Sequence, residues 1–209
     1  MASARTQPKE RARAADDTRA RIFQAAAKLF AKYGWRETTV DKIVREAGVA
    51  KGTFFVHFAT KDAVVTELVR KQVRVARKTR DAVLAKGGDA VDALRATVTS
   101  LGEQAAANRE LSRAVVTANL VSPLLGGFAE SVFGGITSEM QDDARAAQRA
   151  GLLTKSVDAE TIAETLITAY FGALLHYATA PTSKPLLELL EPVLAANLEG
   201  FGAKKKKKR

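Results

Sequence analysis

The chain has 209 residues, of which 46% are hydrophobic, enough for one or two domains with a packed core. It contains no cysteine, which excludes disulfides, thiol nucleophiles and cysteine-bound metals and is compatible with a reducing cytoplasm. The N-terminal segment lacks the apolar stretch of a signal peptide, and no run approaches the roughly 18 apolar residues of a membrane span. We therefore expect no membrane partner.

Charge is distributed unevenly along the chain. Residues 1–80 contain 19 Lys/Arg and 8 Asp/Glu, a net charge of +11, whereas residues 81–203 contain 8 and 15, a net charge of −7. The final segment KKKKKR brings the total to +10. A basic first third predicts a polyanion-binding surface and a different role for the acidic remainder, although random asymmetry of a solvated surface is the alternative.

Apolar periodicity predicts four helices in the first part of the chain. Residues 22–33 carry one apolar stripe at three- and four-residue spacing, and Gly34 is a natural stop. The segment TTVDKIVREAG predicts a short second helix with a capping box formed by Thr38 and Asp41. A third short helix is predicted over 49–55, and Thr60 is predicted to cap a long fourth helix that reaches about residue 86.

Longer and less polar helices are predicted over the rest of the chain, at about 89–107, 110–120, 128–150, 158–179 and 184–200. The last two are apolar around most of their circumference. Thr161–Tyr177 and Leu186–Leu198 therefore predict a subunit interface, with a thick intramolecular core as the alternative. The low-complexity ends, 1–15 and 203–209, are predicted to be flexible, and the Lys-rich tail is expected to add non-specific attraction to DNA.

Two short helices joined by a tight glycine turn, with donors on the second, predict a helix-turn-helix over about 39–58. Gly52 lies inside the second helix, where glycine costs about 1 kcal/mol relative to alanine. Close approach to a phosphate chain, or to the preceding helix, would justify that cost. Lys61 lies at a helix N-terminus, where a cation opposes the helix dipole unless a phosphate binds beside it.

The segment from Thr18 to Leu68, TRARIFQAAAKLFAKYGWRETTVDKIVREAGVAKGTFFVHFATKDAVVTEL, resembles the N-terminal domain of the tetracycline-repressor (TetR) family of bacterial transcriptional regulators. The features that carry the resemblance are Phe30, Gly34, Thr38-Thr39, Ile43, Ala47-Gly48-Val49, Lys51-Gly52-Thr53, His57-Phe58 and Lys61. The resemblance implies an all-α protein. Its three-helix DNA-binding domain, 16–76, would be joined by the long fourth helix to a ligand-binding and dimerisation bundle, 77–202.

The resemblance also implies which residues contact DNA. These are Thr39, Lys42, Lys51, Gly52, Thr53, His57 and Lys61. Two positions depart from the family pattern: Phe55 stands where a tyrosine hydroxyl commonly binds phosphate, and Ala50 replaces a common serine that would cap the recognition helix. Simpler roles stay open, with Thr38 as a cap, Lys42 as a solvated lysine and His57 as a surface histidine.

By the same resemblance, the protein is expected to be a cytoplasmic bacterial repressor that binds a palindromic operator as a homodimer through its last two helices. A small-molecule effector would release it, and the candidate ligand contacts are Asn108, Asn119, Tyr170, His176 and Tyr177. No cofactor or metal is expected. An enzyme is disfavoured because the chain has two histidines, no cysteine and no Gly-rich phosphate loop. A non-specific architectural DNA-binding protein is the remaining alternative.

Overall fold

A computed structural model describes residues 6–122, 128–180 and 184–203. These residues form nine α-helices and no β-strand, which confirms the predicted all-α class. The helices are α1 (Thr6–Glu37), α2 (Val40–Ala47), α3 (Lys51–His57), α4 (Lys61–Ala85), α5 (Ala90–Ala106), α6 (Arg109–Val121), α7 (Phe128–Arg149), α8 (Ala159–Thr179) and α9 (Leu186–Gly200). Within the described ranges, no helix combines the length and apolar character needed to cross a bilayer.

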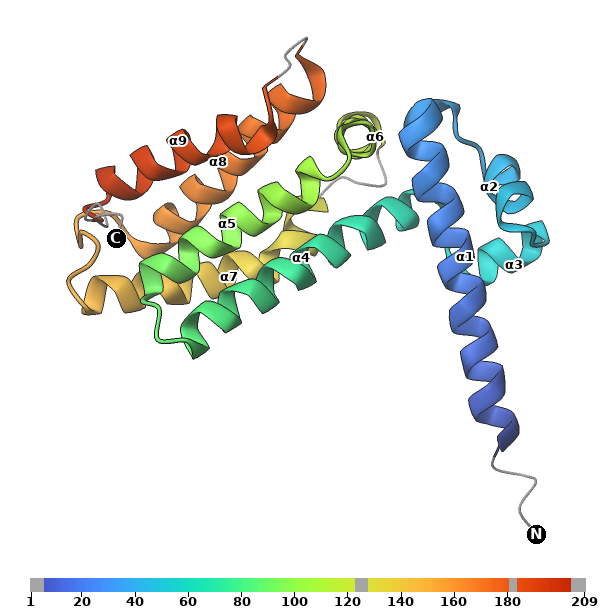
Figure 1. Cartoon of the computed structure of the whole chain (residues 1–209), viewed down its shortest axis with the longest axis horizontal. Coiled ribbons are helices and arrows are strands. Elements are labelled where there is room, and N and C mark those ends of the chain that lie inside the picture. The colour runs from blue at the N-terminus through green and yellow to red at the C-terminus, as the bar shows by residue number, and fades with distance from the viewer. Residues whose placement is uncertain (1–5, 123–127, 181–183, 204–209) are drawn as a thin grey trace.

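The helices form two parts joined by α4. Figure 1 shows α1, α2 and α3 grouped at one end, and α5, α7, α8 and α9 as a bundle at the other. Helix α4 packs against α1 in the first part and against α5 and α7 in the second. Helix α6 also joins the two parts, because it packs against both α1 and α8.

The N-terminal region departs from the expected flexible arm. Helix α1 begins at Thr6, so the expectation is wrong for residues 6–15, while residues 1–5 lie outside the described residues. Alanine, arginine, lysine and glutamate dominate this stretch and favour a helix, and Pro8 is tolerated because it lies in the first turn. The positive φ of Gly34, 79°, interrupts α1 as predicted, although one further turn follows it.

The start of α2 also differs from its prediction. Thr39 is the N-cap, and its hydroxyl accepts a hydrogen bond from the Lys42 amide at 3.3 Å. Thr38 is buried, and its hydroxyl donates to the Gly34 carbonyl at 2.8 Å. The predicted capping box of Thr38 and Asp41 is therefore wrong, because the extra turn of α1 uses Thr38 to satisfy its own carbonyl group.

The remaining helices lie close to their predicted positions. Thr60 caps α4 as predicted, with its hydroxyl accepting from the Ala63 amide at 3.2 Å. In the bundle, α5 and α9 approach closely at Gly102, where an added Cβ would lie 2.7 Å from a methyl group of Leu190. Leu190 and Leu194 are fully buried, so α9 belongs to the intramolecular core on this face.

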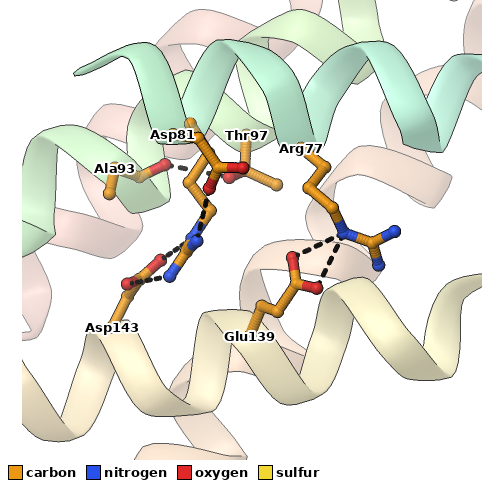
Figure 2. Close-up of polar contacts among 7 residues, drawn as sticks. Arg77, Asp81, Ala93, Thr97, Glu139 and Asp143 are labelled. Carbon is orange, nitrogen blue, oxygen red and sulfur yellow. Dashed lines mark hydrogen bonds and ion pairs between the residues drawn. The ribbon is translucent and has the colours of Figure 1, made fainter. Parts of the chain in front are cut away.

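Two ion pairs fix the second half of α4 to α7. The Arg80 guanidinium donates to both carboxylate oxygens of Asp143, at 2.6 and 2.7 Å, and Arg77 Nε donates to Glu139 at 2.7 and 2.9 Å. Figure 2 shows Glu139 and Asp143 projecting from the same helix toward α4. The Arg80 and Asp143 side chains are 15% and 6% exposed, and hydrogen bonding to Asp143 raises the pKa of Arg80.

Candidate DNA interface and apolar cavity

The two short helices α2 and α3 meet in the tight turn of a helix-turn-helix. Gly48 ends α2 with a φ of 64°, in the left-handed region that glycine adopts without strain. The next amide, of Val49, donates to the Val44 carbonyl at 3.0 Å and closes the turn. Phe54 is fully buried and fixes α3 on the core formed with α1 and α4.

The outer face of α3 is formed by four exposed residues, Lys51, Gly52, Phe55 and Val56. Their spacing places them on one side of the helix, opposite the buried Phe54. Thr53 and His57 are half-buried and flank this face. The predicted recognition residues of α3 are therefore held on a single short helix, and their contact with DNA stays a prediction.

Gly52 has no internal packing role. An added Cβ would meet no described atom within 4 Å, so the glycine does not allow close approach to the preceding helix. Its φ also lies outside the range that requires glycine. Of the two explanations that the sequence offered for Gly52, close approach to an external molecule is the one that remains.

Two of the predicted DNA-binding cations have weak internal partners. Lys51 Nζ lies 2.8 Å from the Asp41 carboxylate, and both side chains are largely exposed. Lys42 Nζ donates to the Glu37 carbonyl at 2.7 Å. An exposed ion pair contributes about 0–1 kcal/mol and a typical hydrogen bond about 0.5–1.5 kcal/mol, so phosphate groups can replace both contacts at little cost.

Lys61 has a more definite structural role. Its ammonium donates to the carbonyls of Trp35 and Thr38 at 2.9 and 3.2 Å and lies 3.9 Å from the centre of the Trp35 ring. Burial lowers the pKa of Lys61 from its ordinary value. The side chain therefore ties the start of α4 to the end of α1, and any phosphate contact would be additional to this role.

Arg19 connects α1, α3 and α4, a role that the sequence did not indicate. Its guanidinium donates to the His57 carbonyl at the end of α3, lies 4.3 Å from the centre of the Phe58 ring, and is 3.7 Å from Glu67 on α4. His57 lies 38 positions from Arg19, so no local pattern links them. We call this contact set, Arg19 with His57, Phe58 and Glu67, the Arg19 clamp.

The bundle contains an apolar cavity of about 200 Å³ between α4, α6, α7 and α8. Its walls are mostly aliphatic and aromatic, with three polar side chains. The lining residues are Val69, Gln72, Val115, Val116, Asn119, Leu120, Phe133, Tyr170, Phe171, Leu174 and Leu175.

The cavity includes two of the five predicted ligand contacts, Asn119 and Tyr170. Asn119 donates to the Val115 carbonyl at 2.9 Å, and burial raises the pKa of Tyr170, which keeps its phenol neutral. Asn108 lies outside the lining as the N-cap of α6, His176 is exposed, and the Tyr177 ring packs 5.1 Å from the Arg109 guanidinium.

Comparison with known proteins agrees with this geometry. The family model described as bacterial regulatory proteins, tetR family, matches residues 22–68, which span the helix-turn-helix. The transcriptional regulator UidR of Escherichia coli K12 is 23% identical over 161 residues, 77% of this chain and 81% of that protein. The Thermus thermophilus repressor FadR, solved with lauroyl-CoA, has a TM-score of 0.72 and 28% identity, and the match covers 91% of this chain and 98% of FadR.

The chain belongs to the TetR family of transcriptional regulators. The transcriptional repressor KstR2 of Mycobacterium tuberculosis is 42% identical over 52 residues, 25% of this chain and 26% of that protein. FadR of Bacillus subtilis, solved with stearoyl-CoA, shares the fold with a TM-score of 0.74 at 18% identity, covering 87% of this chain and 98% of that one. The regulator therefore has a DNA-binding end, and the two FadR proteins that share its fold were each solved in complex with an acyl-CoA.

Proposed function

We propose that this regulator is a repressor that binds a palindromic operator as a homodimer and leaves it when an apolar small molecule occupies the bundle cavity. The main observation behind the proposal is which helices form the cavity wall. Val69 and Gln72 come from α4, and Val115, Val116 and Asn119 come from α6. These are the two bundle helices that also pack against α1 of the DNA-binding domain.

A ligand in this cavity changes operator affinity if it favours one separation of α4 and α6 over another. Because both helices contact α1, a change in their separation also changes the placement of the recognition helix. A preference of about 1–3 kcal/mol for one conformer changes operator affinity about 5–150-fold. Equal affinity for both conformers would change nothing.

The cavity favours an apolar ligand, and we propose a fatty-acyl chain. The lauroyl-CoA and stearoyl-CoA complexes of the two FadR proteins support this class. The volume of about 200 Å³ is below the roughly 300–1,000 Å³ of sites for drug-sized ligands, which fits one end of a chain. Asn119 and Tyr170 are proposed to orient the part of the ligand that enters the cavity.

The ligand proposal is tested by measuring operator release with acyl-CoA thioesters and free fatty acids from octanoyl to stearoyl, with free CoA as a control. Val116→Phe narrows the cavity and is expected to abolish release while leaving operator affinity without ligand unchanged. His176→Ala is the comparison variant, because His176 is exposed and outside the lining. Loss of release in His176→Ala with full release in Val116→Phe would contradict this cavity as the effector site.

Sequence-specific binding is tested by selecting genomic fragments and measuring affinity at several salt concentrations. Several phosphate contacts per subunit predict a steep fall of log affinity with log salt. In a homodimer, the two recognition helices lie about 34 Å apart, so the selected site should be a near-palindrome. Equal affinity for the selected site and for random duplex would favour the architectural alternative.

The dimer is proposed to form through the outer faces of α8 and α9. Val193 on α9 is 44% exposed, and Gly172 and Leu175 are exposed on α8. Val193→Glu is expected to separate the subunits in light scattering. Leu84→Glu is the matched control, because Leu84 is 37% exposed on α4. A mass of 22.4 kDa for the unmodified protein would contradict the dimer.

A further inference from the structure

The recognition helix exposes more apolar surface than hydrogen-bonding groups. On its outer face, Val56 is 80% exposed and Phe55 is 50% exposed, while Gly52 has no side chain and Lys51 is the single polar residue. Of these four positions, Lys51 alone has a side chain that can form a hydrogen bond with a base edge. We call Phe55 and Val56 the apolar pair.

The apolar pair is rigid. The Phe55 ring lies 5.4 Å from the ring of the fully buried Phe54, at an interplanar angle of 88°, which is a favourable edge-to-face contact. Val56 is β-branched, and its side chain has one strongly preferred rotamer in a helix. Both groups therefore present fixed surfaces and lose little conformational entropy when a partner covers them.

The surroundings of the apolar pair select the kind of partner. Lys51 lies on the same face, Lys42 is exposed on the adjoining α2, and residues 1–80 carry a net charge of +11. A protein partner with a purely apolar surface does not match these cations. A duplex does, because its phosphates flank a groove in which the thymine C5-methyl is the apolar group on the base edges.

We propose that Phe55 and Val56 determine operator specificity by packing against thymine methyl groups in the major groove. This inference rests on the proposed operator binding and adds the chemical feature that is read. Gly52, one helical turn before Val56, has open space around its Cβ position, which leaves room for a base edge to approach this surface. The operator half-site should therefore contain one or two thymines at which the methyl group itself contributes to affinity.

The test replaces each thymine of the selected operator by deoxyuridine, which removes the methyl group and leaves the hydrogen-bonding groups unchanged. For the unmodified protein, one or two positions per half-site should lose affinity by roughly fourfold for each methyl group uncovered. Val56→Ala and Phe55→Ala should each remove the penalty at one position. Lys51→Ala is the control and should weaken binding while leaving the methyl penalties unchanged.

The outcomes separate this inference from the proposed function. Tight, specific binding with no effect of any deoxyuridine substitution would overturn the thymine-methyl contact and leave the repressor proposal intact. Binding to no duplex at all would overturn both. If Val56→Ala changes the oligomeric mass and leaves the methyl penalties unaltered, the apolar pair is a protein contact and the inference is wrong. Melting curves of both variants identify any loss of folding, and the deoxyuridine series needs only the unmodified protein.

Discussion

The two halves of α4 are held in different ways. Its second half is fixed to α7 by a bidentate, nearly buried ion pair between Arg80 and Asp143. Its first half meets the DNA-binding domain through Lys61, which donates to the Trp35 and Thr38 carbonyls, and through the Arg19 clamp, in which the Arg19–Glu67 pair spans 3.7 Å and both side chains are partly exposed. Two buried polar atoms near this junction, Trp35 Nε1 and Asp62 Oδ1, have no hydrogen-bond partner among the described residues.

This difference indicates where α4 can move. Buried, well-oriented pairs resist displacement, whereas exposed pairs and unsatisfied polar atoms cost little to rearrange. Val69 and Gln72, the cavity residues on α4, lie between the two halves. A ligand that displaces them should therefore tilt the first half of α4 about a fixed second half. The DNA-binding domain would move with it, because Lys61 ties the start of α4 to the carbonyls of Trp35 and Thr38.

Removing the Arg80–Asp143 ion pair at the second half of α4 should destabilise the protein most. Asp143→Ala leaves the Arg80 guanidinium largely buried without its main partner and should lower the free energy of unfolding by about 3 kcal/mol. The remaining contact of Arg80 with Asp81, at 2.8 Å, keeps the loss at the lower end of the usual range. Urea denaturation at a fixed protomer concentration measures the change.

Two further variants make this prediction specific. Asp142→Ala removes an exposed partner of Arg145 on the same helix and should change the free energy of unfolding by less than about 0.5 kcal/mol. The double variant Arg80→Met/Asp143→Leu should recover most of the loss, because an apolar pair avoids burying a lone charge. A loss below about 1 kcal/mol in Asp143→Ala would mean that the second half of α4 is not firmly held.

A smaller loss of stability is expected when the contacts at the first half of α4 are broken. Arg19→Ala removes the clamp and should lower the free energy of unfolding by about 1 kcal/mol, below the usual value for a charged hydrogen bond because Arg19 is partly exposed. The amides of α3 should exchange hydrogen faster, since His57 at its end loses this contact. Arg21→Ala, an exposed position on α1, is the control. Unchanged exchange in α3 would show that Phe54 alone holds the helix.

The helix positions could be predicted because their signals are local. Apolar periodicity located the helices, and the predicted cap Thr60 accepts a hydrogen bond from a residue three positions later in the chain. Thr38 was misassigned as a cap because its partner is the carbonyl of Gly34, in a turn of α1 that the stop at Gly34 did not predict. The general fold therefore follows from short-range patterns, with errors where one helix ends and the next begins.

The site was less predictable because its contacts join distant segments. Arg19 reaches His57 across the three-helix core, and Lys61 reaches Trp35 over 26 positions. In the bundle, α8 is apolar on most sides, so its pattern does not show which face lines the cavity. Tyr170 and Leu174 line it, whereas His176 is exposed only two positions further along the chain.

Adding a capping group at the start of α3 should change stability less than either loss described above. Ala50 is the N-cap of α3, with backbone angles of φ −71° and ψ 151° that suit a capping residue, but it has no oxygen to accept from the first-turn amides. Ala50→Ser should raise the free energy of unfolding by about 0.5–1 kcal/mol. Thr60→Ala, at the cap of α4, should lose about the same amount, because it removes the bond from the Ala63 amide.

Ala59→Ser is the matched control, since it adds a hydroxyl at an exposed loop position that is not a cap. If the first half of α4 and its attached domain unfold before the bundle, Ala50→Ser should slow hydrogen exchange in α3 and leave exchange in α7 unchanged. Equal slowing in α3 and α7 would mean that the two ends unfold as one unit. The two halves of α4 would then be equally firm, and ligand-driven tilting would need a hinge elsewhere.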